Sequence, residues 1–398
     1  MKTDFIIPIT EIKNRIAAIQ RRLRESSIDA LCILQQVDLY YFSGTAQNGF
    51  LFIPAEEEPL LFVIKYLPRA QKESPLKNII GINSIRDVPG LVRDYYGHTF
   101  NTLSFEFDVL PVRDFEYYKT LFSASGYVDG SDIILQTRTI KSPWEIEQME
   151  KTAALADKTF EYIRSSIRPG FTEIEFSGMY ETFARKHGHG GLLRVRTYRE
   201  KAYNWHILSG ESGGVVGVLD APASGEGTSP AFPHGAGNRI IQAGEPIMVD
   251  LGTVLNGYHT DETRMFAIDS MPDEAMDACM ASIEIHDYIL DNVKPGIPVH
   301  KLYDISVDKA NQLGFLSQYL GPENDKVIFV GHGVGLELVE QPIIAKGKKT
   351  LLKPGMTFSL EPKLVYKDRF SAGIESVFAV TETGCRLISK VPVDVFIC

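Results

Sequence analysis

EPIMVDLGTVLNGYHTDETRMF, residues 245–266, contains two apolar runs separated by an Asn-Gly pair. Apolar runs on both sides of such a pair predict a β-hairpin with a tight turn. Each run carries one acid, Asp250 in the first and Asp261 in the second. If the hairpin folds about the bond between Leu255 and Asn256, the two carboxylates lie directly opposite each other. Facing carboxylates repel, so the pair predicts a bound cation, and hard divalent ions prefer oxygen ligands of this kind.

A second acid-bearing hairpin is predicted further along the chain. Glu361 and Glu375 each lie in a short apolar run, and Asp368 in the polar segment between them is equidistant from both. A hairpin that turns at Asp368 therefore brings the second pair of acids together. Pro362 must then lie at an edge or at a bulge, because it cannot donate a ladder hydrogen bond.

A histidine flanked by glycines lies between the two hairpins. Residues 331–335 read GHGVG, and the glycines on both sides of His332 allow the backbone to approach its neighbours closely. A lone histidine in an apolar strand is usually structural, and a single Asp more often ends a strand or faces water. A histidine held in a loop between two acid-bearing hairpins is more typical of a metal ligand.

The order of these residues resembles that of the pita-bread metallopeptidases, which include methionine aminopeptidase, prolidase and Xaa-Pro aminopeptidase, with creatinase as a metal-free relative. The resemblance implies a two-metal centre with five ligands, which are Asp250, Asp261, His332, Glu361 and Glu375. It implies that Asp250 chelates one ion, that Asp261 and Glu375 bridge both, and that His332 and Glu361 complete the second set. Oxygen-rich ligands with one imidazole favour Mn²⁺ or Co²⁺, with Fe²⁺ or Zn²⁺ as alternatives.

The same resemblance implies two catalytic residues. His234 follows Pro233 in an irregular segment, residues 208–237, and lies sixteen residues before Asp250. Long irregular segments of this kind are usually functional or mobile, and an exposed loop histidine is the alternative. In the family a histidine at this place holds the substrate and steadies the tetrahedral intermediate. A hydroxide that bridges the two metals attacks the carbonyl, and Glu361 transfers the proton to the leaving nitrogen.

The chain departs from the family pattern at two positions. Active peptidases usually have a histidine where this chain has Val339, and prolidases usually have an arginine where it has Gly373. Valine cannot donate a hydrogen bond to an oxyanion, and loss of one such donor costs about 100- to 1000-fold in rate. We therefore expect Val339→His, together with Gly373→Arg, to raise the turnover of prolyl peptides. The candidates for a replacement donor are His206, Tyr258, His259 and Arg264.

Three functions remain open after these departures. The first is a dinuclear-metal hydrolase of the Xaa-Pro dipeptidase or Xaa-Pro aminopeptidase type, which cleaves N-terminal X-Pro or related amide bonds. The second is a non-peptidase metalloenzyme on the same scaffold, a small-amide hydrolase or a lyase, and the two departures favour it. The third is a catalytically silent binding homologue, since a fold alone does not establish an activity.

The chain of 398 residues is long enough for two domains. Strand and helix patterns alternate over residues 1–138, which predicts an α/β domain, and DLYYFSG at residues 38–44 resembles the N-terminal domain of creatinase and prolidase. Ser142 and Pro143 indicate the start of a long helix just after it. We expect the second domain, residues 139–398, to have the α+β pita-bread fold. Methionine aminopeptidases usually lack the first domain.

The composition and net charge limit the kinds of molecule that we expect this protein to bind. With 41 basic and 51 acidic residues the net charge is −10, which disfavours nucleic acid. We find no stretch long enough to span a membrane and no secretory signal. Cys32, Cys279, Cys385 and Cys398 are dispersed, as expected for buried or free thiols in a reducing cytoplasm. The expected partner is a small peptide or amide substrate, and the resemblance implies a homodimer.

Overall fold

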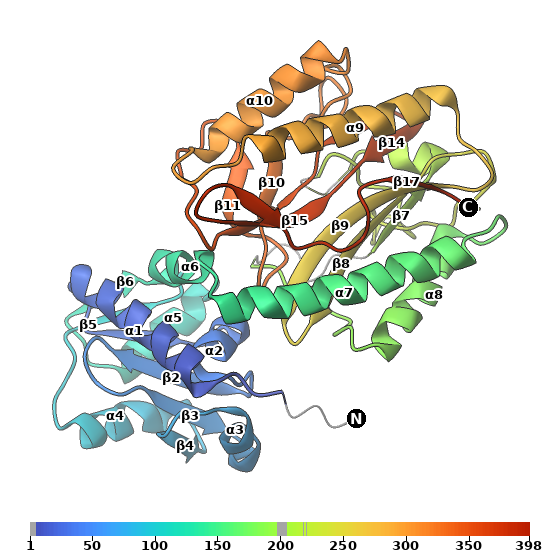
Figure 1. The fold of residues 1–398 in the computed structure, drawn as a ribbon. Helices are drawn as coiled ribbons and strands as arrows, with labels where there is room; N and C mark the ends of the chain where they lie inside the picture. The colour runs from blue at the N-terminus through green and yellow to red at the C-terminus, as the bar shows by residue number, and fades with distance from the viewer. Residues whose placement is uncertain (1–4, 197–204, 218, 220) are drawn as a thin grey trace. The chain divides into compact units, whose positions relative to one another are not determined.

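The computed structural model describes residues 5–196, 205–217, 219 and 221–398. It separates into two compact units at the boundary between Arg138 and Thr139 (Figure 1). The units are described one at a time.

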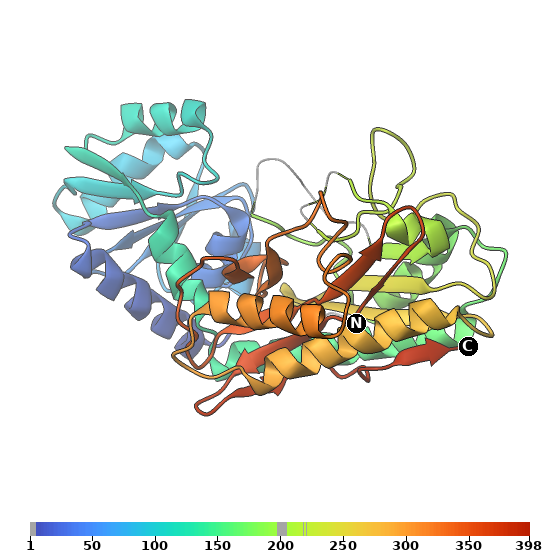
Figure 2. The ribbon, with the colours of Figure 1, turned by 90° about the horizontal axis from the view of Figure 1, so that it is seen from above.

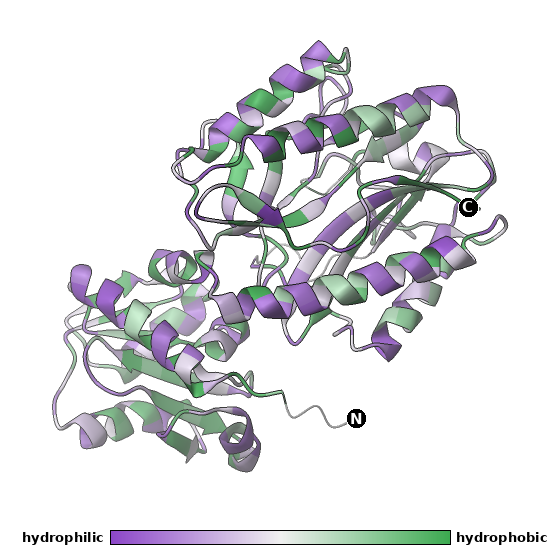
Figure 3. Ribbon diagram, in the orientation of Figure 1, coloured by the Kyte–Doolittle hydropathy of each residue, from purple (hydrophilic) through white to green (hydrophobic). Residues whose placement is uncertain are grey.

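The first unit is an α/β domain built on a mixed sheet with the strand order β4-β3-β2-β1-β5-β6. Its strands are β1 Ala30–Ile33, β2 Gly49–Pro54, β3 Leu60–Ile64, β4 Ile79–Ile82, β5 Thr102–Phe105 and β6 Gly126–Asp129. Its helices are α1 Ile9–Glu25, α2 Gln36–Ser43, α3 Leu67–Glu73, α4 Val88–Tyr96, α5 Val112–Leu121 and α6 Ser131–Thr139, with a 3₁₀ turn at Ile85–Asp87. The strands are mostly hydrophobic, as Figure 3 shows, because both faces of this sheet are covered. The predicted N-terminal architecture is confirmed.

The second unit contains two sheets and a separate hairpin. One sheet has the order β17-β9-β8-β7 and the other β11-β10-β12-β15-β16, while β13 pairs with β14 alone. The strands are β7 His206–Ser209, β8 Ile247–Leu255, β9 Tyr258–Ala267, β10 Phe329–Gly333, β11 Glu340–Ala345, β12 Thr357–Leu360, β13 Lys363–Tyr366, β14 Phe370–Gly373, β15 Ser376–Val380, β16 Cys385–Leu387 and β17 Val395–Ile397.

Two pairs of helices cover these strands. The helices are α7 Pro143–Ser166, α8 Glu173–Lys186, α9 Asp273–Asp291 and α10 Val299–Gln312, and a 3₁₀ turn spans Gly210–Gly214. Helix α7 packs on β8 and β9, α9 on β14, and α10 on β11 (Figures 1 and 2). The predicted start of α7 is confirmed, because Ser142 and Glu145 form a capping box with Pro143 in the first turn.

The hairpin of β8 and β9 has a two-residue turn. Leu255 pairs with Tyr258 across it, and Asn256 and Gly257 have φ angles of 53° and 89°. Positive φ at both positions is the reason that Asn-Gly favours this turn. The turn is therefore centred between Asn256 and Gly257, and the predicted centre one residue earlier is wrong.

The corrected register changes how the two acids meet. Asp250 pairs with Thr263, and Asp261 pairs with Gly252, so the carboxylates are not directly opposite as predicted. Since Gly252 follows Asp250 by two residues, all of these positions share one face of the sheet. Asp250 and Asp261 are diagonal neighbours, a spacing that leaves room for a cation between them.

The second hairpin has the predicted centre. Lys363 pairs with Gly373 in β13 and β14, and Leu360 pairs with Ser376 in β12 and β15. Both pairings are symmetric about Asp368. Together they show one continuous register that extends through two successive ladders.

Glu361 and Glu375 occupy equivalent places in the short gap between these ladders. The register therefore places the two acids opposite each other, as the spacing predicted. Pro362 lies in the same gap, where no ladder hydrogen bond from its nitrogen is needed.

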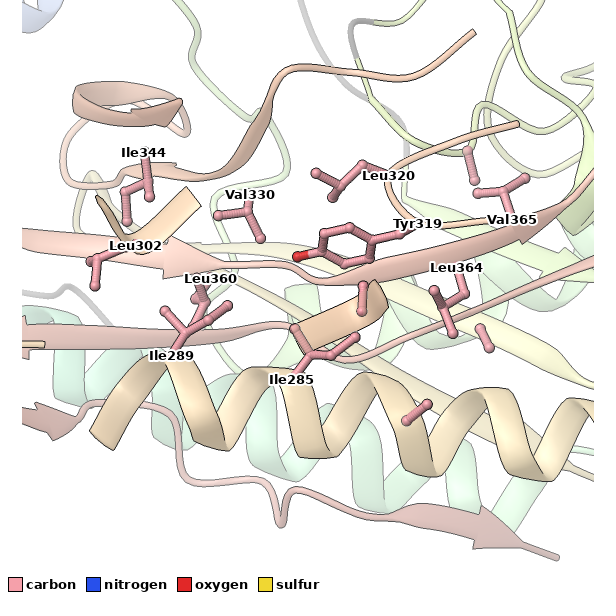
Figure 4. Packing of buried hydrophobic residues seen from close by; sticks show 14 of the residues in the cluster. Ile285, Ile289, Leu302, Tyr319, Leu320, Val330, Ile344, Leu360, Leu364 and Val365 are labelled. Carbon is pink, nitrogen blue, oxygen red and sulfur yellow. The ribbon is translucent and has the colours of Figure 1, made fainter. Parts of the chain in front are cut away.

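Buried side chains fix the second hairpin against α9. Ile285 and Ile289 of α9 pack in one cluster with Leu360 and Leu364 of the hairpin and with Val330 of β10 (Figure 4). All five are fully buried, and burying a side chain of this size contributes about 1.5–3 kcal/mol. This packing holds the strands that carry the acids and the histidine.

The cysteines agree with the sequence-based expectation. The four cysteines are free thiols, two of them buried. Among the described residues, no helix is both long and apolar enough to cross a membrane.

Candidate active site

A cavity of about 270 Å³ in the second unit brings the five predicted ligands together. They reach it from β8, β9, β10 and the gap that separates the two ladders of the second hairpin. The ligand residues that line the cavity are Asp250, Asp261, His332, Glu361 and Glu375. All but Asp250, which is half-buried, are buried.

His332 lies on strand β10, so the prediction of a loop is wrong here. A Cβ atom at Gly331 would lie 2.3 Å from the Ser359 carbonyl oxygen, and one at Gly333 would lie 2.2 Å from that of Gln341. Neither contact is possible, which confirms that the glycines allow a close backbone approach. The reason is that β10 pairs with a strand on each side.

One set of ligands fits a single divalent ion. Asp261, His332 and Glu375 each offer one ligand atom, and these atoms lie within 4.8 Å of one another. His332 Nε2 lies 3.6 Å from Glu361 Oε1. His332 Nδ1 lies 3.0 Å from the Gly333 carbonyl oxygen, so a proton on Nδ1 donates to that oxygen. This hydrogen bond leaves the Nε2 lone pair for a metal.

At the predicted ion position of Asp250 lies a side chain that the sequence reasoning missed, Lys363. Lys363 Nζ lies 3.0 Å from Asp250 Oδ2, 3.0 Å from Glu361 Oε2 and 3.2 Å from Glu375 Oε2. An ammonium group has three N–H donors, and each of them has a carboxylate partner here. The Lys363 side chain is only 5% exposed.

A sequence signal for Lys363 exists. It follows Glu361 by two residues, and alternate residues of an extended chain face the same side. The symmetry of the hairpin about Asp368 also places Lys363 opposite Gly373. A Cβ atom at Gly373 would lie 2.5 Å from Lys363 Cγ, which is too close for real atoms. Glycine is thus required beside this lysine, so Gly373→Arg would force Lys363 to move, and its effect on turnover stays a prediction.

Burial and the mutual charges of the cluster shift its pKa values. Burial lowers the pKa of Lys363, but the three carboxylates outweigh this effect and hold it well above its usual value. Burial raises the pKa of Asp250, but Lys363 and then His206 lower it below its usual value. Burial, with the charges of Glu375 and Asp250, raises the pKa of Asp261 well above its usual value. Lys363 is therefore charged at neutral pH and offsets part of the negative charge of the cluster.

Neutral donors also occupy the Glu375 carboxylate. Thr263 Oγ1 donates to Glu375 Oε2 at 2.8 Å, and Ser359 Oγ donates to Oε1 at 2.9 Å. With Lys363 as a second donor, both lone pairs of Oε2 are used, whereas Oε1 keeps one. Burial raises the pKa of Glu375 to about 7, against the opposing effect of Lys363.

His206 is the candidate replacement donor that the structure places in the cavity wall. It pairs with Asp250 across β7 and β8, and its Nδ1 lies 3.9 Å from Asp250 Oδ2. Its Nε2 is buried and has no hydrogen-bond partner among the described residues. Burial lowers the pKa of His206 to about 4, so the imidazole is neutral at neutral pH.

The other three candidates have structural roles. His259 Nε2 accepts from the backbone of Arg194 at 3.1 Å, and its Nδ1 lies 3.2 Å from the Gly335 carbonyl oxygen. Tyr258 donates its hydroxyl to Glu145. The buried guanidinium of Arg264 donates to the carbonyl oxygens of Thr263, Glu375, Val391 and Pro392 and to Ser376 Oγ.

His234 lies near this wall and is not among the described residues that line the cavity. It is half-buried, and its charge contributes to the lowered pKa of His206. Its loop is anchored by the buried Glu173, whose carboxylate accepts from the backbone of Ser209 at 2.7 Å and of Gly237 at 3.0 Å. A role for His234 on the substrate side remains a prediction.

The rest of the cavity wall is apolar. Val339, where active relatives usually have histidine, lies in this wall and is half-buried. The other apolar side chains that line the cavity are Leu193, Leu219, Ala221, Phe329, Leu338 and Ile343. A substrate in this cavity would therefore meet both hydrogen-bonding groups and hydrocarbon.

Comparison with known sequences identifies the family. The family described as metallopeptidase family M24 matches residues 147–382, and the creatinase/prolidase N-terminal domain matches residues 15–140. The chain belongs to metallopeptidase family M24. Its N-terminal domain and its pita-bread catalytic domain are those of that family, and it is a metallopeptidase whose substrate the comparisons leave open.

The M24 relatives resemble this chain over nearly their whole length. An uncharacterised peptidase of Staphylococcus epidermidis is 27% identical over 383 residues, covering 94% of this chain and 99% of the relative. A Xaa-Pro dipeptidase of Pyrococcus furiosus is 25% identical over 382 residues, covering 95% and 98%. The solved Xaa-Pro dipeptidase of Bacillus anthracis has a TM-score of 0.82 at 24% identity, covering 97% and 100%, which supports the fold.

Proposed function

We propose that this metallopeptidase cleaves peptides with proline in the second position, as its relatives named Xaa-Pro dipeptidase do. The observation that carries the proposal is the cavity in which Asp250, Asp261, His332, Glu361 and Glu375 meet, although they lie far apart in the sequence. The relatives support the substrate class, since they match the chain from end to end.

Asp261, His332 and Glu375 are the residues we propose to hold a divalent ion. An ion bound there acts as a Lewis acid on a carbonyl group and makes water a better nucleophile at neutral pH. Glu361 lines the same cavity with Oε1 beside His332 Nε2. Its carboxylate can accept a proton from the attacking water and pass it to the leaving nitrogen, as a general base and then a general acid.

We propose His206 as the hydrogen-bond donor that offsets the absence of histidine at Val339. A neutral imidazole with a proton on Nε2 can donate to the substrate carbonyl oxygen as negative charge develops on it. His206 has that nitrogen buried in the cavity wall without a partner among the described residues. The apolar wall around Val339 suits the ring of a proline or another apolar side chain.

A peptide panel tests the proposal. Metal-loaded enzyme is incubated with Ala-Pro, Leu-Pro and X-Pro-Y peptides, with Ala-Ala as the non-proline control, and the released amino acids are measured by mass spectrometry. Asp261→Asn, which keeps the volume and removes a ligand charge, should be inactive. Absence of cleavage of every X-Pro peptide by the wild type would refute the substrate assignment.

The role of His206 has its own comparison within that panel. His206→Leu should lower kcat by about 100- to 1000-fold, the effect of losing one oxyanion donor, and should keep the metal content. His206→Gln retains a side-chain N–H and should recover part of the rate. Equal rates in both variants would show that His206 does not donate to the substrate.

A small amide or a lyase substrate is the second candidate. The apolar Val339 in the wall and the glycine at 373 beside Lys363 favour it, because both remove groups that peptidases of this family usually present. The same assay with small cyclic and linear amides distinguishes the two candidates. The homodimer, the cytoplasmic location and the preference for Mn²⁺ or Co²⁺ remain predictions.

A further inference from the structure

We infer that the Lys363 ammonium takes the place of one ion of the two-metal centre that the family resemblance implies, so that this chain binds a single divalent ion. The inference deepens the proposed function and rests on it for the identity of the ligands. It was not expected from the sequence, where all five ligand positions are intact.

The distribution of atoms around Lys363 identifies which ion is replaced. In the predicted set Asp250 serves only one ion, and its Oδ2 is bound to Lys363. Glu361 is divided between the two positions, with Oε2 on Lys363 and Oε1 beside His332. His332 Nε2 and Glu361 Oε1 are not among the three partners of the ammonium and belong to the other ion, and Asp261, the predicted bridging ligand, lies beside His332 Nε2 at 3.7 Å.

The charge balance of the site also favours a single divalent ion. The four carboxylates of Asp250, Asp261, Glu361 and Glu375 carry four negative charges. One divalent ion and one ammonium offset three of them, whereas two divalent ions and the ammonium exceed them by one. A second ion at Asp250 would also lie within a few ångströms of a buried like charge, where repulsion is weakly screened.

The surrounding residues make the lysine a fitted part of the site. Its three N–H groups are all paired, its side chain is 5% exposed, and it packs against a glycine across the ladder. Thr263 supplies the remaining donor to Glu375 Oε2, so this oxygen is saturated without a metal. Bringing an ion to Asp250 requires the ammonium to break three charged hydrogen bonds.

Metal content of the full chain tests the inference. The protein is stripped with a chelator, equilibrated with excess Mn²⁺, passed through a desalting column and measured by elemental mass spectrometry. We expect about one ion per wild-type chain and about two per Lys363→Ala chain. Electron paramagnetic resonance should show isolated Mn²⁺ in the wild type and a magnetically coupled pair in Lys363→Ala.

Lys141→Met is the matched control. Lys141 is also a buried lysine of the second unit, 2% exposed, with Nζ 2.9 Å from Glu340 Oε2. Its loss leaves a buried acid without this lysine, but it does not touch the carboxylate cluster. Lys141→Met should therefore keep the wild-type metal content, so that a gain seen only in Lys363→Ala reports on the metal centre.

The results of these experiments distinguish failure of the inference from failure of the proposed function. Two ions per wild-type chain, or a coupled Mn²⁺ signal from it, would overturn the inference, and so would a folded Lys363→Ala with unchanged metal content. If Lys363→Ala does not fold, the wild-type count and spectrum still decide. Cleavage of X-Pro peptides by a two-ion wild type would refute the inference alone. One bound ion without peptide cleavage would refute the proposed function and leave the inference standing.

Discussion

Gly373→Ala is the smallest change that tests the fit between the two hairpin strands at the site. The added Cβ atom would lie 2.5 Å from Lys363 Cγ, 3.2 Å from Met248 Cε and 3.3 Å from Lys363 Cβ. The first contact is about an ångström shorter than ordinary van der Waals contact, and Cγ is the inner part of the side chain. The lysine cannot relieve the clash without moving its ammonium off the carboxylates.

The expected magnitude follows from this overlap. Inserting one methyl group into a well-packed site costs about 1–3 kcal/mol. In a Lys363→Ala background the Cγ atom is absent, and the two remaining contacts, at 3.2 Å with the flexible end of Met248 and at 3.3 Å with the Cβ atom of residue 363, cost much less. We therefore expect the two substitutions to be coupled by about 1–2 kcal/mol, within the range for residues in direct contact.

Urea unfolding of metal-free protein measures this coupling. The two tryptophans, Trp144 and Trp205, both lie in the second unit, so their fluorescence follows that unit alone. The free energy of unfolding is compared for wild type, Gly373→Ala, Lys363→Ala and the double variant. Gly178→Ala is the matched control, since a Cβ atom there meets nothing within 4 Å. That control should be neutral or stabilising, because alanine favours a helix over glycine.

Additivity would contradict this reasoning. If Gly373→Ala costs the same in both backgrounds, the lysine stem does not lie against Gly373. If Gly373→Ala is neutral in the wild type, the lysine adopts another position at no cost. Either result would also remove the steric support for a fixed ammonium in the metal centre.

Two further predictions concern histidines. His234→Ala should retain the wild-type metal content and lose most of its kcat, because His234 is predicted to hold substrate; a lost ion would instead make it a ligand. Burial lowers the pKa of His259 to about 4, against about 6.5 in an unfolded chain. As pH falls from 6.5 to 4 the unfolded state takes up a proton and the folded state does not, so His259 should lower the unfolding free energy by up to about 1.4 kcal/mol per pH unit. Unfolding at pH 7 and pH 5 should show a smaller difference in His259→Gln, and an equal difference would refute the assignment.

The sequence predicted both hairpins because local turn chemistry specifies them. Asn256-Gly257 defines the first turn, yet the predicted centre lies one residue too early, which moves every cross-strand partner by two positions. The prediction that the two acids lie close together survived this error, because a shift of two positions leaves Asp250 and Asp261 on the same face of the hairpin. Clustering of carboxylates can therefore be predicted from an approximate strand register, whereas direct pairing of two residues requires the correct one.

The parts of the site that the sequence could not supply depend on strands that are distant in the chain. His206 reaches the cavity only because β7 pairs with β8, and nothing in its neighbourhood distinguishes it from His259. His259 is equally buried but has both ring nitrogens against backbone atoms. Lys363 differs from His206, because its spacing of two residues from Glu361 is visible in the sequence. It was overlooked because a lysine at that position has no role in the family pattern.

Lys363, Gly373 and Val339 have one combined effect on the substrate. The prolidase pattern places an arginine at position 373, and the 2.5 Å contact shows that no side chain there can coexist with Lys363 in its present place. In this chain the positive charge is therefore on Lys363, which pairs with position 373 from the opposite strand of the hairpin. Arginine has five donors and can serve a carboxylate and a substrate together, whereas all three donors of Lys363 are bound to acids. With Val339 also unable to donate, we propose His206 as the wall donor for substrate, which favours substrates with an apolar side chain against this wall over those that need several anchoring hydrogen bonds there.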